Sequence, residues 1–407
     1  MLESRSASGQ FEIGVPQLAE VAQALSARVE EGLAEDGHEI AALPTFISVG
    51  EGGAPVAGQS ALVLDLGGTN LRAARVNVVG GGEMVVAAGP LELTLPIRRG
   101  VAFPLEQFLG LQARALEEVA EGQTHLPLGY CFSYPARSTA QGDATLIRWT
   151  KGVTIAGLEG RPVGRSLLDA MGEALARPER VAVVNDTVAA LFASLSGPAT
   201  DGHVGLIVGT GNNMATFFPA GRIGKLQASE LGGSDLIPVN LESGNFSPPH
   251  LSPFDAQLDQ LSENPGYQRF EKAVSGAYLG RLLALAHPEM EMDTERGAQL
   301  LVELAASGTR GVAGETANAI LRRSARLVAA SICGLLLCRF GTGCEFSARI
   351  LAEGSLFWKA PGYKEEVERV LATLPSQLGL RCTVQVAASP NANIMGTALA
   401  ALSARRH

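Results

Sequence analysis

Residues 61–77, ALVLDLGGTNLRAARVN, carry the most informative pattern of the chain. An apolar run that ends at Asp65 predicts a strand, Gly67 and Gly68 predict a tight turn, and a second strand is expected to begin near Leu71. A turn without side chains can adopt positive φ, and it lets consecutive backbone N–H groups converge on an anion. We interpret the segment as a hairpin that binds a nucleotide polyphosphate, with additional donors from Thr69, Asn70 and Arg72. An ordinary Gly-Gly hairpin is the alternative.

A second hairpin with the same plan follows at residues 203–218, HVGLIVGTGNNMATFF. Its turn is expected at 209–212, between two apolar strands. Two such hairpins predict two related halves that hold a nucleotide in the cleft between them. This arrangement resembles the actin-like, sugar-kinase-like ATPases, so the predicted fold class is α/β with a small and a large domain.

Composition sets limits on the function. The chain has 407 residues, 46% of them hydrophobic, and a net charge of −9 with dispersed basic residues, which favours two domains and argues against nucleic-acid binding. Five dispersed cysteines indicate reduced thiols that pack as small apolar groups, and no His/Cys spacing suits a structural metal. We find no signal pattern and no apolar run long enough to span a bilayer, and therefore expect a cytoplasmic protein.

Apolar periodicity predicts helices over 15–35, 104–120, 314–338 and 392–405, the last one rich in Ala and Gly, which allow either close packing or a hinge. A strand is expected over 126–134. Residues 181–195, VAVVNDTVAALFASL, predict a buried strand that ends at Asn185-Asp186, directly before a helix. Ligands of open α/β sheets bind at the carboxyl ends of strands, so Asp186 is a candidate catalytic residue; a helix N-cap is its other interpretation.

Eight segments, in order, resemble the hexokinase family, which includes glucokinases, in its bacterial single-unit form. They are LPTF (43–46), LDLGGTNLR (64–72), LPLGYCFSYP (126–135), WTKG (149–152), VNDTVAALFA (184–193), GLIVGTGNN (205–213), NLESGNF (240–246) and NPGYQRFEKAVSGAYLG (264–280). The resemblance implies transfer of the γ-phosphoryl group of ATP to the 6-hydroxyl of a hexose, either glucose or a relative such as mannose or fructose. It also implies a hexokinase-type, ribonuclease H-like fold.

A sugar hydroxyl needs a positioned carboxylate to accept its proton, and Asp186 resembles that base. Lys151 is expected to steady charge near the transferred group. Hexoses present several hydroxyls, and specificity requires fixed donors and acceptors around them. By similarity to the family, the sugar is surrounded by Ser133, Thr150, Lys151, Asn185, Asp186, Asn213, Glu242 and Glu271.

The resemblance also implies a nucleotide site. It places Asp65, Gly67, Gly68, Thr69, Asn70 and Arg72 around the β- and γ-phosphates, and Thr210, Gly211, Gly354 and Ser355 at the other end of the nucleotide. Mg²⁺ is expected to bind mainly through ATP phosphates, with Asp65 in contact through water. The chain departs from the family at Glu353-Gly354-Ser355, where Asp-Gly-Ser is usual, in the run 392–396, and near Leu321-Arg322, where Ser-Thr is usual.

These patterns predict a small domain of residues 57–187 plus 393–407 and a large domain of residues 1–56 plus 188–392. A catalytically silent sugar sensor on the same fold is the main alternative, although Asp186 and Lys151 argue against it. A sugar kinase of the repressor-related family would carry a cysteine-rich zinc site, which this chain lacks. An actin-like structural ATPase would not explain the segments at 133–152 and 185–187.

Overall fold

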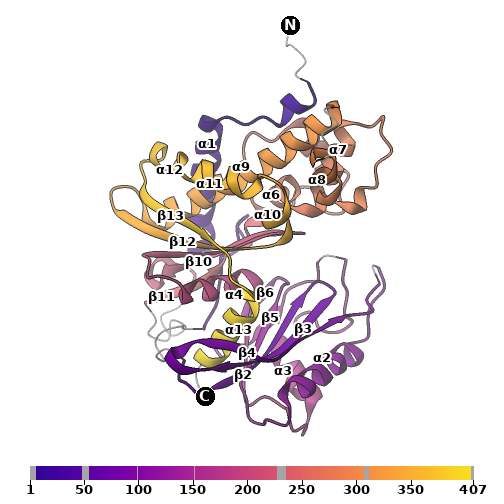
Figure 1. Cartoon of the computed structure of the whole chain (residues 1–407), viewed down its shortest axis with the longest axis vertical. Coiled ribbons are helices and arrows are strands. Elements are labelled where there is room, and N and C mark those ends of the chain that lie inside the picture. The colour runs from indigo at the N-terminus through magenta and orange to yellow at the C-terminus, as the bar shows by residue number, and fades with distance from the viewer. Residues whose placement is uncertain are drawn as a thin grey trace.

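Two β-sheets, each covered by helices, build the molecule (Figure 1). The computed structural model describes residues 6–47, 55–98, 100–150, 152–226, 235–306 and 311–404. The strands are β1 Leu43–Pro44, β2 Ser60–Gly67, β3 Asn70–Val78, β4 Met84–Thr94, β5 Leu128–Phe132, β6 Ala136–Ser138, β7 Ala144–Leu146, β8 Val181–Val184, β9 Gly202–Val208, β10 Asn212–Pro219, β11 Leu236–Asn240, β12 Glu345–Glu353 and β13 Arg381–Ala387. The helices are α1 Val15–Ala34, α2 Leu105–Ala120, α3 Val163–Met171, α4 Asp186–Ala193, α5 Pro253–Gln260, α6 Arg269–Val274, α7 Gly276–Ala286, α8 Ala298–Ala306, α9 Val312–Phe340, α10 Ser355–Lys359, α11 Tyr363–Leu371, α12 Leu374–Gln377 and α13 Ala392–Ser403.

The smaller sheet has the strand order β4-β3-β2-β5-β8. Strands β2, β3 and β4 are antiparallel neighbours, whereas β5 and β8 run parallel to β2. Side chains alternate along β2: Leu62 and Leu64 pack with α2 and α3, and Ala61 and Val63 pack with α13. Because both faces are covered, the strand is apolar at nearly every position.

The larger sheet has the order β1-β11-β10-β9-β12-β13. Its first four strands are antiparallel neighbours, and β12 and β13 are parallel to β9. The long helix α9 and helix α1 lie over one face and contribute Leu25, Val29, Val328 and Leu335 to the main core. Helix α4 covers the other face, where Leu191 and Phe192 are fully buried.

Helices α4 and α13 lie between the two sheets (Figure 1), and glycines permit their close approach. A Cβ atom at Gly205 of β9 would lie 2.0 Å from the carbonyl oxygen of Thr187, and one at Gly396 of α13 would lie 1.8 Å from that of Ala189. A Cβ at Gly129 of β5 would lie 2.2 Å from the oxygen of Thr397. The larger sheet, α4, α13 and the smaller sheet form successive layers. These layers can stack this closely only because glycine occupies the three positions.

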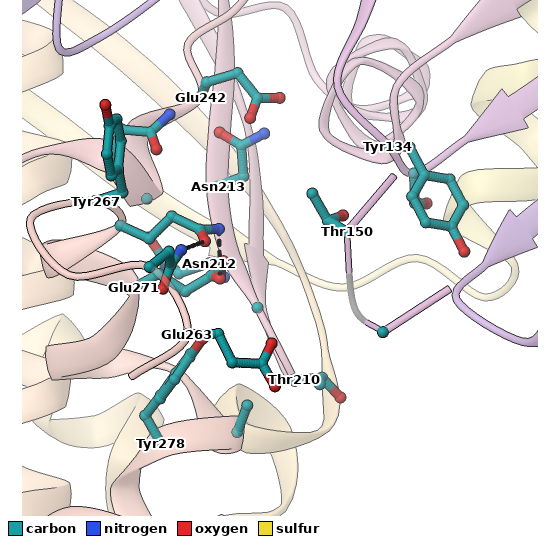
Figure 2. A pocket seen from close by; sticks show the side chains of 18 of the residues that line it. Tyr134, Thr150, Thr210, Asn212, Asn213, Glu242, Glu263, Tyr267, Glu271 and Tyr278 are labelled. Atoms are coloured by element: carbon teal, nitrogen blue, oxygen red, sulfur yellow. Dashed lines mark hydrogen bonds between the residues drawn. The ribbon is translucent and has the colours of Figure 1, made fainter. Parts of the chain in front are cut away.

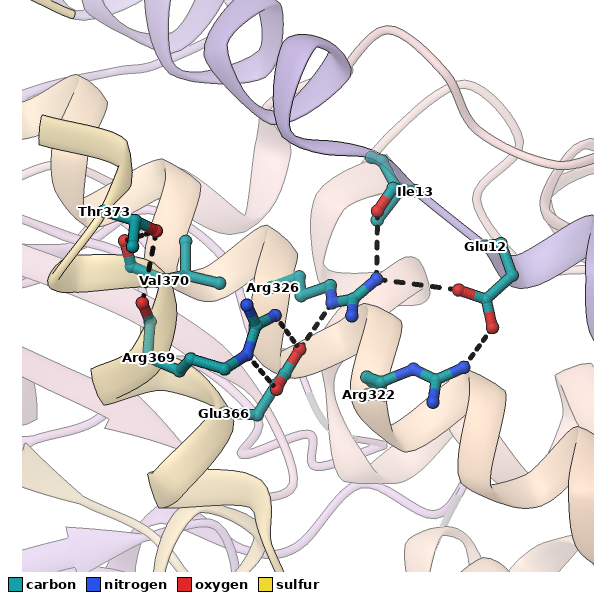
Figure 3. A network of polar contacts seen from close by, with 8 residues as sticks. All are labelled: Glu12, Ile13, Arg322, Arg326, Glu366, Arg369, Val370 and Thr373. Atoms are coloured by element: carbon teal, nitrogen blue, oxygen red, sulfur yellow. Dashed lines mark hydrogen bonds and ion pairs between the residues drawn. The ribbon is translucent and has the colours of Figure 1, made fainter. Parts of the chain in front are cut away.

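The polar network in Figure 3 fastens the segment before α1 to α9 and α11. Glu12 pairs with Arg322, and Nη1 of Arg326 donates to the carbonyl oxygen of Ile13 at 3.0 Å. Nε of Arg326 also donates to Oε1 of Glu366 at 2.5 Å. The segment at 321–322, where the chain departs from the family pattern, thus contacts the N-terminal segment, and Leu321 is buried in the core.

The predicted helices and hairpins are present, with small shifts of their ends. Strand β2 continues past Asp65 to Gly67, and β3 begins at Asn70. The prediction that all five cysteines pack as apolar groups is wrong for Cys344, which is exposed in the connection between α9 and β12. Helix α4 crosses the proposed limit at 187, because it begins at Asp186, with a single residue between it and the end of β8, and then packs on the larger sheet. The domain limits stay a prediction.

Candidate active site

A cavity of about 860 Å³ opens between the two sheets, which is large enough for a small-molecule ligand. Figure 2 shows Tyr134 and Thr150 on one side of it and Asn213, Glu242 and Glu271 on the other. The first wall comes from the connections after β5 and β7, and the second from the β9–β10 turn and the segments that follow β11 and α5. Both halves of the chain therefore contribute polar groups to one site.

Seven of the eight side chains predicted to face a sugar line this cavity: Ser133, Thr150, Asn185, Asp186, Asn213, Glu242 and Glu271. The eighth, Lys151, lies outside the described residues. These seven come from segments distributed over more than 130 positions of the chain, and the fold brings them together.

Asn185 and Asp186 lie where β8 ends and α4 begins. Asn185 is the N-cap, because its Oδ1 accepts hydrogen bonds from the backbone N of Thr187 at 3.0 Å and from Oγ1 of Thr187 at 2.7 Å. Asp186 is the first helical residue; its Oδ1 accepts from the same backbone N at 2.9 Å, and the residue is only half-buried. The capping position that the sequence left open for Asp186 is thus filled by Asn185, and Asp186 faces the cavity.

Asn240, which the sequence interpretation missed, connects two of the predicted residues. Its Oδ1 accepts from Nδ2 of Asn213 at 2.7 Å, and its Nδ2 donates to Oε1 of Glu242 at 2.8 Å. Asn213 in turn accepts the backbone N–H groups of Met214 and Ser243 on its Oδ1, at 2.8 and 3.1 Å. The amides on this wall are therefore held from behind before any ligand enters.

Glu271 occupies the first turn of α6 and lies beside the β9–β10 turn. Its Oε2 accepts from the backbone N of Asn212 at 3.2 Å, and its Oε1 accepts from Nε2 of Gln268 at 3.0 Å. Asn212 and Gln268 also line the cavity and were not predicted. Only their positions mark them in the sequence: Asn212 is next to Asn213, and Gln268 lies about one helical turn before Glu271.

An aromatic cluster supports the opposite wall. The Trp149 ring meets the Tyr134 ring edge-on at 4.7 Å between centroids and contacts Phe132 and Phe108 as well. Nε1 of Trp149 donates to the carbonyl oxygen of Ile155 at 3.2 Å. The backbone just before Thr150 is therefore anchored in the core of the smaller lobe.

The residues predicted to hold a nucleotide fall into two groups. Thr210 and Gly211 line the cavity, whereas Asp65, Gly67, Gly68, Thr69, Asn70, Arg72, Gly354 and Ser355 are outside its lining. The first hairpin nevertheless adjoins the cavity, because the hydroxyl of Tyr134 donates to the carbonyl oxygen of Gly68 at 2.8 Å. Gly354 adjoins the second hairpin: a Cβ at Gly209 would lie 3.4 Å from the Cα of Gly354.

Electrostatics connect the first hairpin with the end of β12. Asp65 is buried and paired with Arg72, whose Nε donates to Oδ2 at 3.0 Å. Burial opposes the charge on Arg72, but the Asp65 carboxylate raises the pKa of the guanidinium overall, and Glu353 at the end of β12 acts in the same direction. Burial raises the pKa of Glu353, with Arg72 opposing and Asp65 reinforcing that shift. Residues of both sheets thus share one charged cluster beside the cavity.

Burial also raises the pKa of the Cys131 thiol well above its usual value, and the nearby carboxylates of Asp65 and Asp186 add to the shift. Cys131 is therefore a protonated, apolar-type neighbour of the site.

Within the described residues, no cluster of three or more His, Cys, Asp or Glu side chains is arranged to hold a metal ion. None of the helices in the described ranges is long and apolar enough to cross a membrane.

Two sheets of this topology with a polar cavity between them define a two-domain fold of the actin-like ATPase class. Two family models described as hexokinase match the chain, one over residues 3–195 and the other over 203–300 and 285–403. Hexokinase-1 of Oryza sativa subsp. japonica is 31% identical over 96% of this chain and 88% of its own length. The hexokinase of Schwanniomyces occidentalis is 30% identical over 89% of this chain and 84% of its own length.

A solved structure of a hexokinase from Schistosoma mansoni, complexed with glucose, has the same fold, with a TM-score of 0.79 at 24% identity over 97% of both chains. The chain belongs to the hexokinase family, as the sequence motifs predicted, and is an enzyme of that family.

Proposed function

We propose that this hexokinase transfers the γ-phosphoryl group of ATP, bound with Mg²⁺, to the 6-hydroxyl of glucose or a related hexose, with Asp186 as the general base. The observation that carries the proposal is the position of Asp186, half-buried at the start of α4 and facing a cavity lined by six further polar groups of the family pattern. A carboxylate there can accept the proton of a hydroxyl as that oxygen attacks phosphorus.

The polar lining suits a hexose because it offers both donors and acceptors at fixed positions. Glu242 and Glu271 present carboxylate oxygens for hydroxyl protons, while Asn185, Asn213 and Thr150 add amide and hydroxyl groups. Hydrogen bonds from Asn240, Gln268 and the backbone N of Asn212 hold the two carboxylates. Such a site disfavours a ligand that leaves these half-buried groups unpaired.

The first hairpin suits a phosphate chain. Gly68 has φ of 68°, and a Cβ at Gly67 or Gly68 would meet no atom within 4 Å, so a phosphate oxygen can approach the backbone there. Arg72 would add a cationic donor, and Asp65 would hold Arg72 in place. When bound, Mg²⁺ would neutralise charge on the transferred group, mainly through the phosphates and their waters.

The decisive experiment compares Asp186→Ala and Asp186→Asn with the parent enzyme in a coupled assay for sugar phosphorylation. We expect a loss of about 10²–10⁴-fold in kcat for both, with glucose affinity reduced far less, because the base acts in the transition state. Asp169→Asn, at an exposed carboxylate paired with Arg165 on α3, is the matched control. Turnover retained in both Asp186 variants would refute the assigned base.

The same assay with glucose, mannose, fructose and several nucleotide donors tests the substrate class. A panel in which no hexose supports ATP-dependent phosphoryl transfer would overturn the proposed reaction.

A further inference from the structure

The side chain of Asn240 lies behind the cavity wall and contacts three segments that reach the cavity. We propose that Asn240 is a positioning residue that fixes the amide of Asn213 and the carboxylate of Glu242 for the sugar. The inference rests on the proposed function, since it assigns the sugar to these two residues.

Asn240 acts from outside the cavity lining. It is the last residue of β11, paired in register with Ala215 of β10 and Leu43 of β1, and its side chain is buried with 4% exposure. It touches no part of the cavity surface, whereas Asn213 and Glu242 both do. Its influence on a ligand therefore passes through the side chains that it contacts, and Asn213 and Glu242 are the two of these that line the cavity.

The hydrogen bonds have only one consistent direction. A carboxylate can only accept, so Asn240 must present its Nδ2 to Oε1 of Glu242, at 2.8 Å. The Oδ1 of Asn240 then faces Asn213, which must present its own Nδ2, at 2.7 Å. That leaves Oδ1 of Asn213 toward the backbone N–H groups of Met214 and Ser243. The carboxylate of Glu242 at one end and the backbone N–H groups of Met214 and Ser243 at the other therefore require the same orientation of the two amides.

Asn240 also restrains the backbone of Glu242. Glu242 has φ of 58°, a left-handed conformation that is unfavourable for a residue with a Cβ. The Oδ1 of Asn240 accepts from the backbone N of Glu242 at 3.4 Å, in the pattern of an Asx turn. One side chain therefore holds both the main chain and the carboxylate of Glu242 in a strained position beside the cavity.

The contact extends to the segment that carries Asp186. Oγ1 of Thr187, fully buried, lies 2.7 Å from Oδ1 of Asn185 and 3.3 Å from Oδ1 of Asn240. Asn240 is thus the point where the β11 end, the β10 start and the α4 start meet through side-chain polar groups. This position explains why a buried amide, which is costly unless paired, occurs here.

The test uses Asn240→Asp and Asn240→Ala, with glucose binding measured by calorimetry in the absence of nucleotide. Asn240→Asp keeps the side-chain shape but turns the donor toward Glu242 into an acceptor. At pH 7.5 we expect glucose Kd to rise about 10–100-fold in both variants, since each leaves buried polar groups unpaired. The KM for ATP is expected to change much less.

The dependence on pH separates positioning from packing. In Asn240→Asp, two carboxyl groups lie next to each other and share a proton as the pH falls toward 5, which restores a donor between them. We expect several-fold recovery of affinity there in this variant and none in Asn240→Ala. The other charged residues of the described lining, Arg148, Asp186, Glu263, Glu271 and Arg281, are present in every variant. Asn318→Asp, an exposed position on α9, controls for the added charge.

The positioning role would be overturned if Asn240→Asp had unchanged glucose affinity. It would also be overturned if both variants lost glucose affinity equally at every pH while their thermal unfolding stayed unchanged. Failure of the proposed sugar site would show elsewhere: Asn213→Ala and Glu242→Gln would then bind glucose as the parent enzyme does.

Discussion

The two glycine hairpins share a sequence pattern but use glycine for different physical reasons. In the β2–β3 turn, Gly68 provides a positive φ of 68°, and the space around it is open. In the β9–β10 turn, no residue has positive φ, but the turn is crowded: Gly209 accepts from the backbone N of Gly276 at 2.7 Å, and Thr210 accepts from that of Ala277 at 3.2 Å. The backbone of the first turn is therefore accessible, whereas the second turn is held by hydrogen bonds from the start of α7.

Crowding at the second hairpin should give the largest effect on stability. A Cβ at Gly354, which has φ of 114°, would lie 2.2 Å from the carbonyl oxygen of Val208 at the end of β9. We expect Gly354→Ala to lower the free energy of unfolding by about 3–5 kcal/mol, from backbone strain and overpacking together. Urea unfolding measures this. The control Ser355→Ala, at an exposed neighbour, should change stability by less than about 0.5 kcal/mol, and a similarly small change in Gly354→Ala would contradict the comparison.

At the first hairpin, the effect should fall on the nucleotide. Gly68→Ala imposes about 1–2 kcal/mol of strain on the turn, so we expect the KM for ATP to rise about 5–30-fold while the KM for glucose stays constant. Gly68→Asn should recover much of the loss, because asparagine tolerates left-handed backbone. Gly122→Ala is the control, because Gly122 also has a positive φ (79°) and open surroundings but lies in the loop after α2.

Gly211 should behave differently from Gly68, although the sequence assigned both to the nucleotide. A Cβ at Gly211 would lie 3.0 Å from Oε2 of Glu271, which must then move. Steady-state kinetics of Gly211→Ala should therefore show a rise of about 3–10-fold in the KM for glucose, the scale of a weakened hydrogen bond, with little change for ATP. Gly221→Ala, at an open position, is the control. A rise confined to ATP would support the original assignment instead.

The smallest effect should come from the charged cluster that joins the first hairpin to Glu353 of β12. The raised pKa of Glu353 means that the folded chain holds this proton more tightly than the unfolded chain does. The stabilisation is therefore complete below the ordinary glutamate pKa and is lost as pH rises through the folded-state pKa. Glu353→Gln should unfold at a higher temperature than the parent at pH 8 and at nearly the same temperature at pH 4.

Glu345→Gln, at the exposed start of the same strand, should show no such difference between the two pH values. Equal shifts for Glu353→Gln at pH 4 and pH 8 would mean that burial of this carboxyl has no thermodynamic consequence.

Sequence periodicity and turn chemistry were sufficient for the hairpins, for α1 and α9, and for the junction of β8 with α4. The family motifs identified seven cavity residues because each lies within a motif segment. The role of Asn240 was not predictable, since its partners Asn213 and Thr187 belong to other elements and meet it only in the folded sheet. The capping choice between Asn185 and Asp186 also depends on geometry, because both residue types are good N-caps.

Helix α13 has a consequence for synthesis of the chain. Ile394, Ala398 and Ala401 cover the Ala61, Val63, Ala74 and Val76 side of the smaller sheet, so that side stays uncovered on a nascent chain until α13 has left the ribosome. The smaller lobe, whose strands all precede β9, is thus completed only by the last helix, and shortening the chain before Ala392 would leave this apolar surface exposed to aggregation.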